Sequence, residues 1–286
     1  MRKTAEGSRP RRVTEAQIAV LGGRLTERDR QIALDCYEHQ VLTTEQLQRL
    51  WFPSERAARH RLQALYLLRV LDRFRPVAKR GEGSAPHHWT LDEAGAYVIA
   101  AEQNIERREL RWRHTTALTI ATSPMLTHRV ETNEFFTRLS QDARATHGAL
   151  SEWYGERTTH SMLDGIAKPD GYGVLTLPGC APLHLLLELD RNTETVERLR
   201  QKSERYARAI PRSALRHSNP LVLLAVPSPS RARAAAAAVA HTGAPIVAAT
   251  WSADCHTAPL DVVITAQKQR GKSATDAQTY IRKKCD

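Results

Sequence analysis

Two apolar runs in the second half of the chain most constrain its fold. Leu221–Val226 is wholly aliphatic, and Leu183–Leu189 contains five leucines in seven residues; strands of this kind are buried on both faces of a sheet. The segments that follow them, Thr195–Ile210 and Ser230–His241, have the composition and spacing of helices. Strands that alternate with helices predict a mixed α/β sheet.

Further segments extend this pattern on both sides. We expect a helix from about Ser123 to Ala145, a strand over residues 150–157, a turn that enters a strand over residues 168–175, and a last strand over residues 246–251. The sequence therefore predicts an α/β domain over residues 123–265.

The first part of the chain has the pattern of a winged helix-turn-helix, so that the whole chain would be α+β. Three expected helices are followed by a hairpin of two strands and by a further helix that begins at Asp92. The expected N-caps are Thr26, Thr43 or Thr44, and Ser54, and the expected hairpin strands are residues 70–74 and 88–91. We predict a winged helix over residues 25–104, in which the basic third helix is the recognition helix.

The positive charge is concentrated in this first part. The net charge is +11, and residues 114–265 carry 15 Lys and Arg against 14 Asp and Glu. Residues 54–80 alone carry eight basic residues against two acidic ones, which is the charge pattern of a protein that binds a polyanion. The predicted DNA contacts are Arg56, Arg59, His60 and Arg61 on the third helix, and Arg75, Lys79 and Arg80 on the hairpin. The alternatives are a solvated helix face and a winged helix that binds protein.

Three carboxylates of the second domain form a candidate site. Asp170 follows Pro169 at a strand start, and Glu188 and Asp190 are two residues apart, which predicts that they share one strand face. Burial of such a carboxylate costs several kcal/mol unless it is paired or binds a metal. Three carboxylates are ligands that Mg²⁺ prefers, and Mg²⁺ can activate water. The alternative is a structural network with nearby cations, namely Arg191, Arg198 or Lys202.

These motifs resemble known families. Pro169-Asp170 and, eighteen residues after Asp170, Glu188-Leu-Asp190 resemble the core of PD-(D/E)XK nucleases. The segment 187–194, together with Lys202 and Tyr206, resembles the replication-relaxation family of plasmids and conjugative elements. The resemblance implies a winged helix joined to a nuclease-like domain, and a DNA-binding role in replication, relaxation or mobilisation of the element.

One position departs from the nuclease pattern. The pattern has lysine two residues after Glu188, where this chain has Asp190, so Lys202 or Lys168 would have to supply the amine. The catalytic set implied by the resemblance is Asp170, Glu188, Asp190 and Lys202. The implied ligands of Mg²⁺ or Mn²⁺ are Asp170, Glu188, Asp190 and Glu134, with Glu131 as the alternative on the same helix. Three functions stay open: DNA binding, a metal-dependent nickase or endonuclease, and a transcriptional regulator with a degenerate nuclease fold.

The remaining segments and the composition complete the expectations. We expect a flexible basic N-terminus over residues 1–24, a linker over residues 105–122 with a charged helix at 106–113, and a mobile basic tail over residues 266–286. The four cysteines form no CxxC pair, and no apolar run approaches the length of a membrane span. We therefore expect a cytoplasmic protein that binds double-stranded DNA and does not bind a membrane. Other expected partners are replication or mobilisation proteins and a second copy of the chain.

Overall fold

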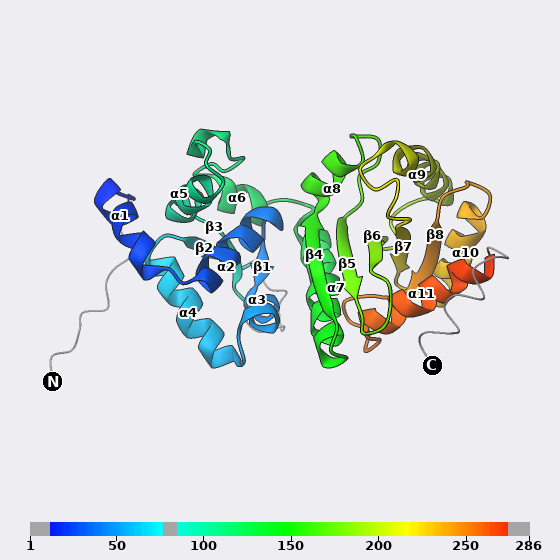
Figure 1. Cartoon of the computed structure of the whole chain (residues 1–286), viewed down its shortest axis with the longest axis horizontal. Coiled ribbons are helices and arrows are strands. Elements are labelled where there is room, and N and C mark those ends of the chain that lie inside the picture. Colours follow the sequence, from blue (N-terminus) through cyan, green and yellow to red (C-terminus); the bar gives the residue numbers. More distant parts are fainter. Residues whose placement is uncertain (1–11, 77–84, 274–286) are drawn as a thin grey trace. The chain divides into compact units, whose positions relative to one another are not determined.

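A computed structural model describes residues 12–76 and 85–273 of the chain (Figure 1). The chain divides into two compact units, with the boundary between Val130 and Glu131. The first unit contains a three-stranded antiparallel sheet and the second a five-stranded mixed sheet. The predicted mixed α/β class is therefore confirmed.

Helices form most of the first unit. They are α1 (Glu15–Arg24), α2 (Glu27–Glu38), α3 (Thr44–Trp51), α4 (Glu55–Leu67), α5 (Glu93–Glu102) and α6 (Thr116–Ala121). Thr26, Thr43 and Ser54 each accept a hydrogen bond from a backbone N–H in the first turn of α2, α3 and α4, respectively. The predicted caps of these three helices are confirmed, and of the two alternatives for α3 the cap is Thr43.

The small sheet joins distant parts of this unit. Its strands are β1 (Leu42–Thr43), β2 (Leu71–Phe74) and β3 (His88–Leu91), in the order β1-β3-β2. Trp89 of the central strand is buried, and its Nε1 donates to Thr44 Oγ1 at 2.9 Å. Residues 77–84, between β2 and β3, lie outside the described part, and so do the predicted DNA contacts Lys79 and Arg80.

Two expectations at the borders of this unit are wrong. Residues 15–24 of the expected flexible N-terminus form α1, because Thr14 caps the helix and Leu21 is buried. The charged helix expected at 106–113 is only a 3₁₀ turn, η1 (Arg107–Glu109). Trp112 is buried after this turn, where its Nε1 donates to Leu91 O at 2.9 Å. Because Trp112 packs into the first unit, the residues after η1 do not continue as a helix.

The second unit is built on the sheet that the apolar runs predict. Its strands lie in the order of the chain: β4 (Ala149–Gly155), β5 (Gly171–Thr176), β6 (Leu183–Leu189), β7 (Leu221–Val226) and β8 (Ile246–Thr250). Strands β4, β5 and β6 pair antiparallel, whereas β6, β7 and β8 pair parallel. The helices are α7 (Leu126–Ala145), α8 (Glu156–Met162), α9 (Val196–Ala209), η2 (Ile210–Arg212), α10 (Pro229–Val239) and α11 (Pro259–Ser273).

Helices cover both faces of this sheet. On one face, Phe135 and Phe136 of α7 and Val263 of α11 pack against leucines of β6 and β7. On the other face, α9 and α10 pack through Tyr206, Leu199 and Ala235. The glycines of β5 allow the first contact, because a Cβ on Gly171 would lie 2.6 Å from the ring of Phe136.

The beginning of the expected mobile tail is also helical. Helix α11 continues to Ser273, and Ala266 is fully buried in the core of the second unit. The prediction is therefore wrong for residues 266–273, because Ala266 anchors this part of α11 in that core. Within the described residues, no helix is long and apolar enough to cross a membrane.

Candidate functional site

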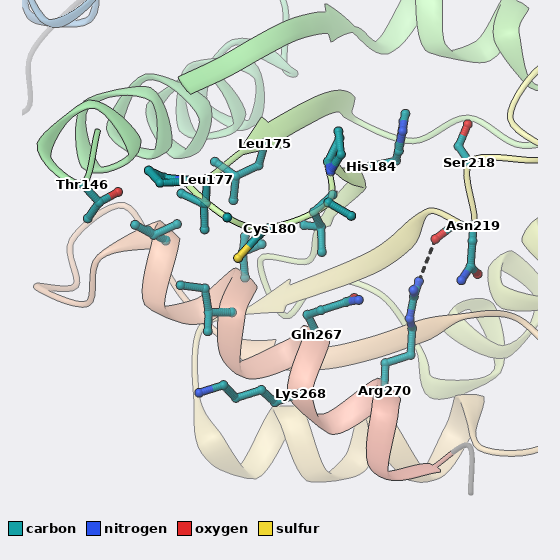
Figure 2. A pocket seen from close by; sticks show the side chains of 18 residues that line it. Thr146, Leu175, Leu177, Cys180, His184, Ser218, Asn219, Gln267, Lys268 and Arg270 are labelled. Atoms are coloured by element: carbon teal, nitrogen blue, oxygen red, sulfur yellow. Dashed lines mark hydrogen bonds between the residues drawn. The ribbon is translucent and has the colours of Figure 1, made fainter. Parts of the chain in front are cut away.

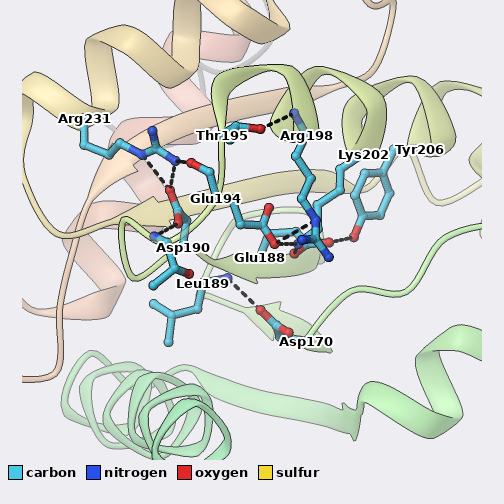
Figure 3. Close-up of polar contacts among 11 residues, drawn as sticks. Asp170, Glu188, Leu189, Asp190, Glu194, Thr195, Arg198, Lys202, Tyr206 and Arg231 are labelled. Atoms are coloured by element: carbon cyan, nitrogen blue, oxygen red, sulfur yellow. Dashed lines mark hydrogen bonds and ion pairs between the residues drawn. The ribbon is translucent and has the colours of Figure 1, made fainter. Parts of the chain in front are cut away.

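Glu188 lies at the end of β6 and is the centre of the candidate site. Its side chain is almost fully buried. Helix α9 supplies two donors: Tyr206 OH donates to Glu188 Oε1, and Lys202 Nζ donates to Glu188 Oε2 at 2.9 Å (Figure 3). Because Lys202 and Tyr206 are four residues apart, they lie on the same side of α9. Thr195 caps this helix and fixes where it begins.

Asp170 lies next to Glu188 across the sheet. The backbone N–H of Asp170 donates to Leu187 O at 2.9 Å, and its Oδ2 accepts from the backbone N–H of Leu189 at 2.8 Å. Both bonds hold Asp170 against the end of β6, beyond the last paired residue Gly171 of β5. Lys202 also forms an ion pair with Glu194, with 2.9 Å between Nζ and Oε1. The structure therefore brings together Asp170, Glu188 and Lys202 of the predicted catalytic set.

These contacts perturb the acidity of the buried groups. Burial, together with the nearby Asp170 carboxylate, raises the pKa of Glu188 to about 7, although Lys202 and Tyr206 oppose this change. Burial and the neighbouring Glu188 carboxylate raise the pKa of Tyr206 well above 10. Burial disfavours the ammonium form of Lys202, but Glu188 and Glu194 outweigh it and raise the pKa of that amine above 10.5. A carboxyl group that titrates near neutral pH beside a charged lysine is typical of functional sites, although structural networks produce it too.

Asp190 has a separate set of partners. Arg231 of α10 donates to Asp190 Oδ2 from Nε at 2.7 Å and pairs with it through Nη2 at 2.6 Å. The same guanidinium donates to Glu194 O at 2.6 Å, and Thr193 N donates to Asp190 Oδ1 at 3.2 Å. Asp190 therefore connects the end of β6 to α10 and to the loop before α9. The sequence reasoning missed Arg231, which lies 41 residues farther along the chain and carries no local signal.

The other predicted acids and amines pair elsewhere. Glu134 forms an ion pair with Arg138 at 2.7 Å on α7, the helix that covers the opposite face of the sheet. Glu131 pairs with Arg191 at 3.0 Å, and Lys168 with Glu156 at 2.9 Å. Among the described residues, no group of three or more His, Cys, Asp or Glu side chains could hold a metal ion. Of the predicted ligands, Asp170 and Glu188 lie side by side, whereas Asp190, Glu134 and Glu131 are each paired with an arginine.

The predicted DNA contacts on α4 divide into two groups. Arg56, Arg59 and His60 are exposed on the same side of the helix. Arg59 pairs with Glu55, but both side chains are largely exposed, and a pair of this kind contributes less than about 1 kcal/mol. Arg61, by contrast, holds the buried Asp29 carboxylate through Nε at 2.7 Å and also through Nη2. Arg61 therefore fastens α4 to the start of α2.

Other arginines of the basic stretch also have internal partners. Arg73 lies 4.4 Å from the centre of the Tyr66 ring and donates to Gln63 Oε1 at 2.7 Å. Arg69 forms two hydrogen bonds of 3.0 Å with Asp92. Arg75 is exposed after β2. Of the basic residues that the structure describes in this stretch, Arg56, Arg59, His60 and Arg75 therefore form the exposed group.

Comparison with known families adds an independent finding. Residues 35–219, about two thirds of the chain, match the sequence model of a family described as Replication-relaxation. The chain belongs to the replication-relaxation family. The match includes α4 and the cluster of Asp170, Glu188 and Lys202, but it ends before β7 and therefore before Arg231. No curated protein and no solved structure matches the chain significantly.

The predicted resemblance is thus confirmed at the level of the family. Both features that we singled out, the basic helix α4 and the buried Glu188 with its lysine, lie inside the segment that defines membership. The function of a replication-relaxation protein of this kind should therefore be sought at these two places.

Proposed function

We propose that this replication-relaxation protein binds double-stranded DNA through the exposed side of α4 and the hairpin β2–β3, and that it acts in replication, relaxation or mobilisation of a plasmid or integrative element. The single observation that carries the proposal is the exposed group Arg56, Arg59 and His60 on a helix that begins with a serine cap. Family membership supports the role in replication or relaxation of a mobile element.

The order of elements in the first unit supports this proposal. Helices α2, α3 and α4 are followed by two antiparallel strands, and β1 adds a third strand next to β3. A winged helix has this order, and its third helix presents its first turns to the major groove. Arg56, Arg59 and His60 all lie in the first two turns of α4.

The test uses charge reversal on α4. The Arg56→Glu/Arg59→Glu double variant of the full chain is compared with a matched double variant, Arg208→Glu/Arg233→Glu, whose arginines are exposed on α9 and α10. Binding to a pool of random duplexes is measured by fluorescence anisotropy at several salt concentrations. The measured quantity is the slope of the logarithm of the binding constant against the logarithm of the salt concentration. Each lost phosphate contact reduces the magnitude of this slope by about 1, so we expect a reduction of about 2 for the α4 variant.

The matched variant has the same change in net charge, so it separates a local contact from the overall charge of the protein. We expect it to bind with a nearly unchanged slope. Equal affinity and equal slope for the α4 variant and the unaltered protein would refute the assignment of α4. If both double variants lost the same affinity for DNA, the loss would be due to the change in net charge.

A second candidate function is a metal-dependent nickase, and one observation favours it. Lys202 Nζ lies 2.9 Å from Glu188 Oε2, so an amine stands near the carboxylates although Asp190 replaces the lysine of the nuclease motif. Asp170, Glu188, Asp190 and Lys202 would carry this activity with Mg²⁺ or Mn²⁺. Nicking of supercoiled plasmid is measured with each ion, and nicking that persists in Asp170→Ala would exclude this site.

A further inference from the structure

A cavity of about 720 Å³ lies in the second unit, away from the candidate site (Figure 2). Its wall is formed by the turn between β5 and β6, the residues just before β7, and one side of α11. His184 lines it near the start of β6, whereas Glu188 lies four residues farther along the strand, about 13 Å away. The cavity is therefore distinct from the carboxylate cluster.

The body of the cavity is apolar. Leu177, Leu183 and Ile264 line it and are half-buried against the main core of the second unit. Its volume falls in the range of about 300–1,000 Å³ that is usual for small-molecule sites. An apolar wall with a few polar groups is also usual for such sites.

Polar groups of α11 line the same cavity. Gln267 Oε1 is buried without a hydrogen-bond partner. A buried acceptor of this kind calls for a donor, because leaving it unpaired is costly. Arg270 is half-buried and donates to Asn219 O at 3.0 Å. In the part of the chain that the structure describes, neither Lys268 nor Arg270 takes part in an ion pair.

The charge at the cavity has one sign. Lys268 and Arg270 are cations, and among the residues that the structure describes no Asp or Glu lines the cavity. A guanidinium that is half-buried without a carboxylate is complemented by an anionic group of a ligand. An apolar body of one molecule would cover the leucines and Ile264, while its polar head would reach Gln267 and Arg270.

We propose that this cavity binds an amphipathic small molecule with one carboxylate or similar anionic group at Arg270, a hydrogen-bond donor at Gln267 Oε1, and an apolar body against Leu177, Leu183 and Ile264. The site goes beyond the proposed DNA binding and does not depend on it. It would give the second unit a small-molecule ligand.

The test begins with 8-anilino-1-naphthalenesulfonate, which combines aromatic rings, an N–H donor and a sulfonate. We expect one molecule to bind per folded chain, with increased fluorescence. Decanoate should displace it, and each methylene of a shorter or longer fatty acid should change the affinity about fourfold, since a buried CH₂ contributes about 0.8 kcal/mol. Decanol should bind about tenfold more weakly than decanoate, because it lacks the charge.

The Arg270→Met variant keeps the apolar stem and removes the guanidinium. We expect it to lose the tenfold preference for decanoate while it binds decanol within about twofold of the unaltered protein, and Arg270→Lys should retain the preference. Because decanol binding reports an intact cavity, the ratio of the two affinities separates loss of the head contact from loss of the fold.

Several outcomes would overturn the proposal. The first is that the dye does not bind at about 100 μM. The second is that the unaltered protein binds decanoate and decanol with equal affinity. The third is that Arg270→Met keeps the preference for decanoate over decanol. If the chain self-associates and the dye is thereby excluded, a second copy of the chain covers the cavity instead of a small molecule. Chromatography with light scattering detects this last outcome.

Discussion

Replacing Glu188 by glutamine removes the charge of the buried carboxyl group and keeps its shape. In the unaltered protein this group accepts hydrogen bonds from Tyr206 and Lys202. The amide oxygen of glutamine can accept only one of them, a loss that is the same at every pH of the experiment. The group titrates near pH 7 in the folded chain, because burial and Asp170 raise its pKa from 4.5. The variant should therefore differ from the unaltered protein in how its stability depends on pH.

The sign and size of this difference follow from the two pKa values. Between pH 4.5 and about 7 the folded chain keeps the proton on Glu188 while the unfolded chain has released it. The free energy of unfolding due to this group therefore falls as the pH rises through that range. At about 1.4 kcal/mol per pH unit, the loss is about 3 kcal/mol above pH 7. Glutamine does not titrate, so Glu188→Gln should gain about 3 kcal/mol relative to the unaltered protein between pH 4.5 and 8.

Urea unfolding followed by circular dichroism at several pH values measures this gain. Lys202 does not disturb the comparison, since its amine titrates only above pH 10.5. A control is Glu204→Gln on the exposed side of the same helix, for which we expect a difference of less than about 0.5 kcal/mol at every pH. A constant difference for Glu188→Gln would refute the reasoning. If Lys202 and Tyr206 outweighed burial and lowered the pKa below 4.5, the variant would lose stability relative to the unaltered protein as the pH rises toward 4.5, and the difference would be constant above that pH.

Two further substitutions test how the elements are fastened. Arg61→Ala should lower the free energy of unfolding by about 2 kcal/mol, because the buried Asp29 carboxylate loses its cation; an unchanged urea midpoint would contradict this role. Gly171→Ala should lower it by about 2 kcal/mol, because the new Cβ would lie 2.6 Å from the ring of Phe136. Gly22→Ala is the control: its Cβ would meet nothing within 4 Å in helix α1, so thermal unfolding should show a gain of about 0.5–1 kcal/mol.

Local patterns were sufficient to predict most elements. Ser54 and Thr26 cap the helices that they were expected to begin, because a cap depends only on the residues of the next turn. The run Leu183–Leu189 forms β6, because a short segment with five leucines in seven residues is typical of a strand buried on both faces. These features depend on neighbouring residues alone, which a single sequence contains.

Elements whose signal lies in distant partners were missed or misplaced. Strand β1 has only two residues, and it exists because Leu42 pairs with Trp89 across 47 positions of the chain. Helix α11 was assigned in part to a mobile tail, although Ala266 packs into the core. Polar and small residues outnumber apolar ones at its C-terminal end, so composition favoured a tail, whereas tertiary packing decided the outcome.

The basic stretch shows the same limit for function. Its charges are indistinguishable in the sequence, but the structure gives some of them internal partners: Arg61 holds Asp29, Arg69 holds Asp92, and Arg73 stacks on Tyr66. Net charge therefore overstates the number of cations that can reach a phosphate. A charge-reversal experiment at Arg61 would mix loss of stability with loss of binding, whereas Arg56 and Arg59 are exposed.

The two carboxylates at the end of β6 have different roles in the structure. Asp190 binds Arg231 and thereby connects β6 to α10, a contact that a lysine at position 190 could not make. Glu188 binds Lys202 of α9 instead, so the amine stands near the buried carboxylate from another element. Where the nuclease pattern that the sequence resembles has a lysine, Asp190 links β6 to α10. The structure therefore places the amine beside Glu188 and Asp170, whereas Asp190 is held by Arg231.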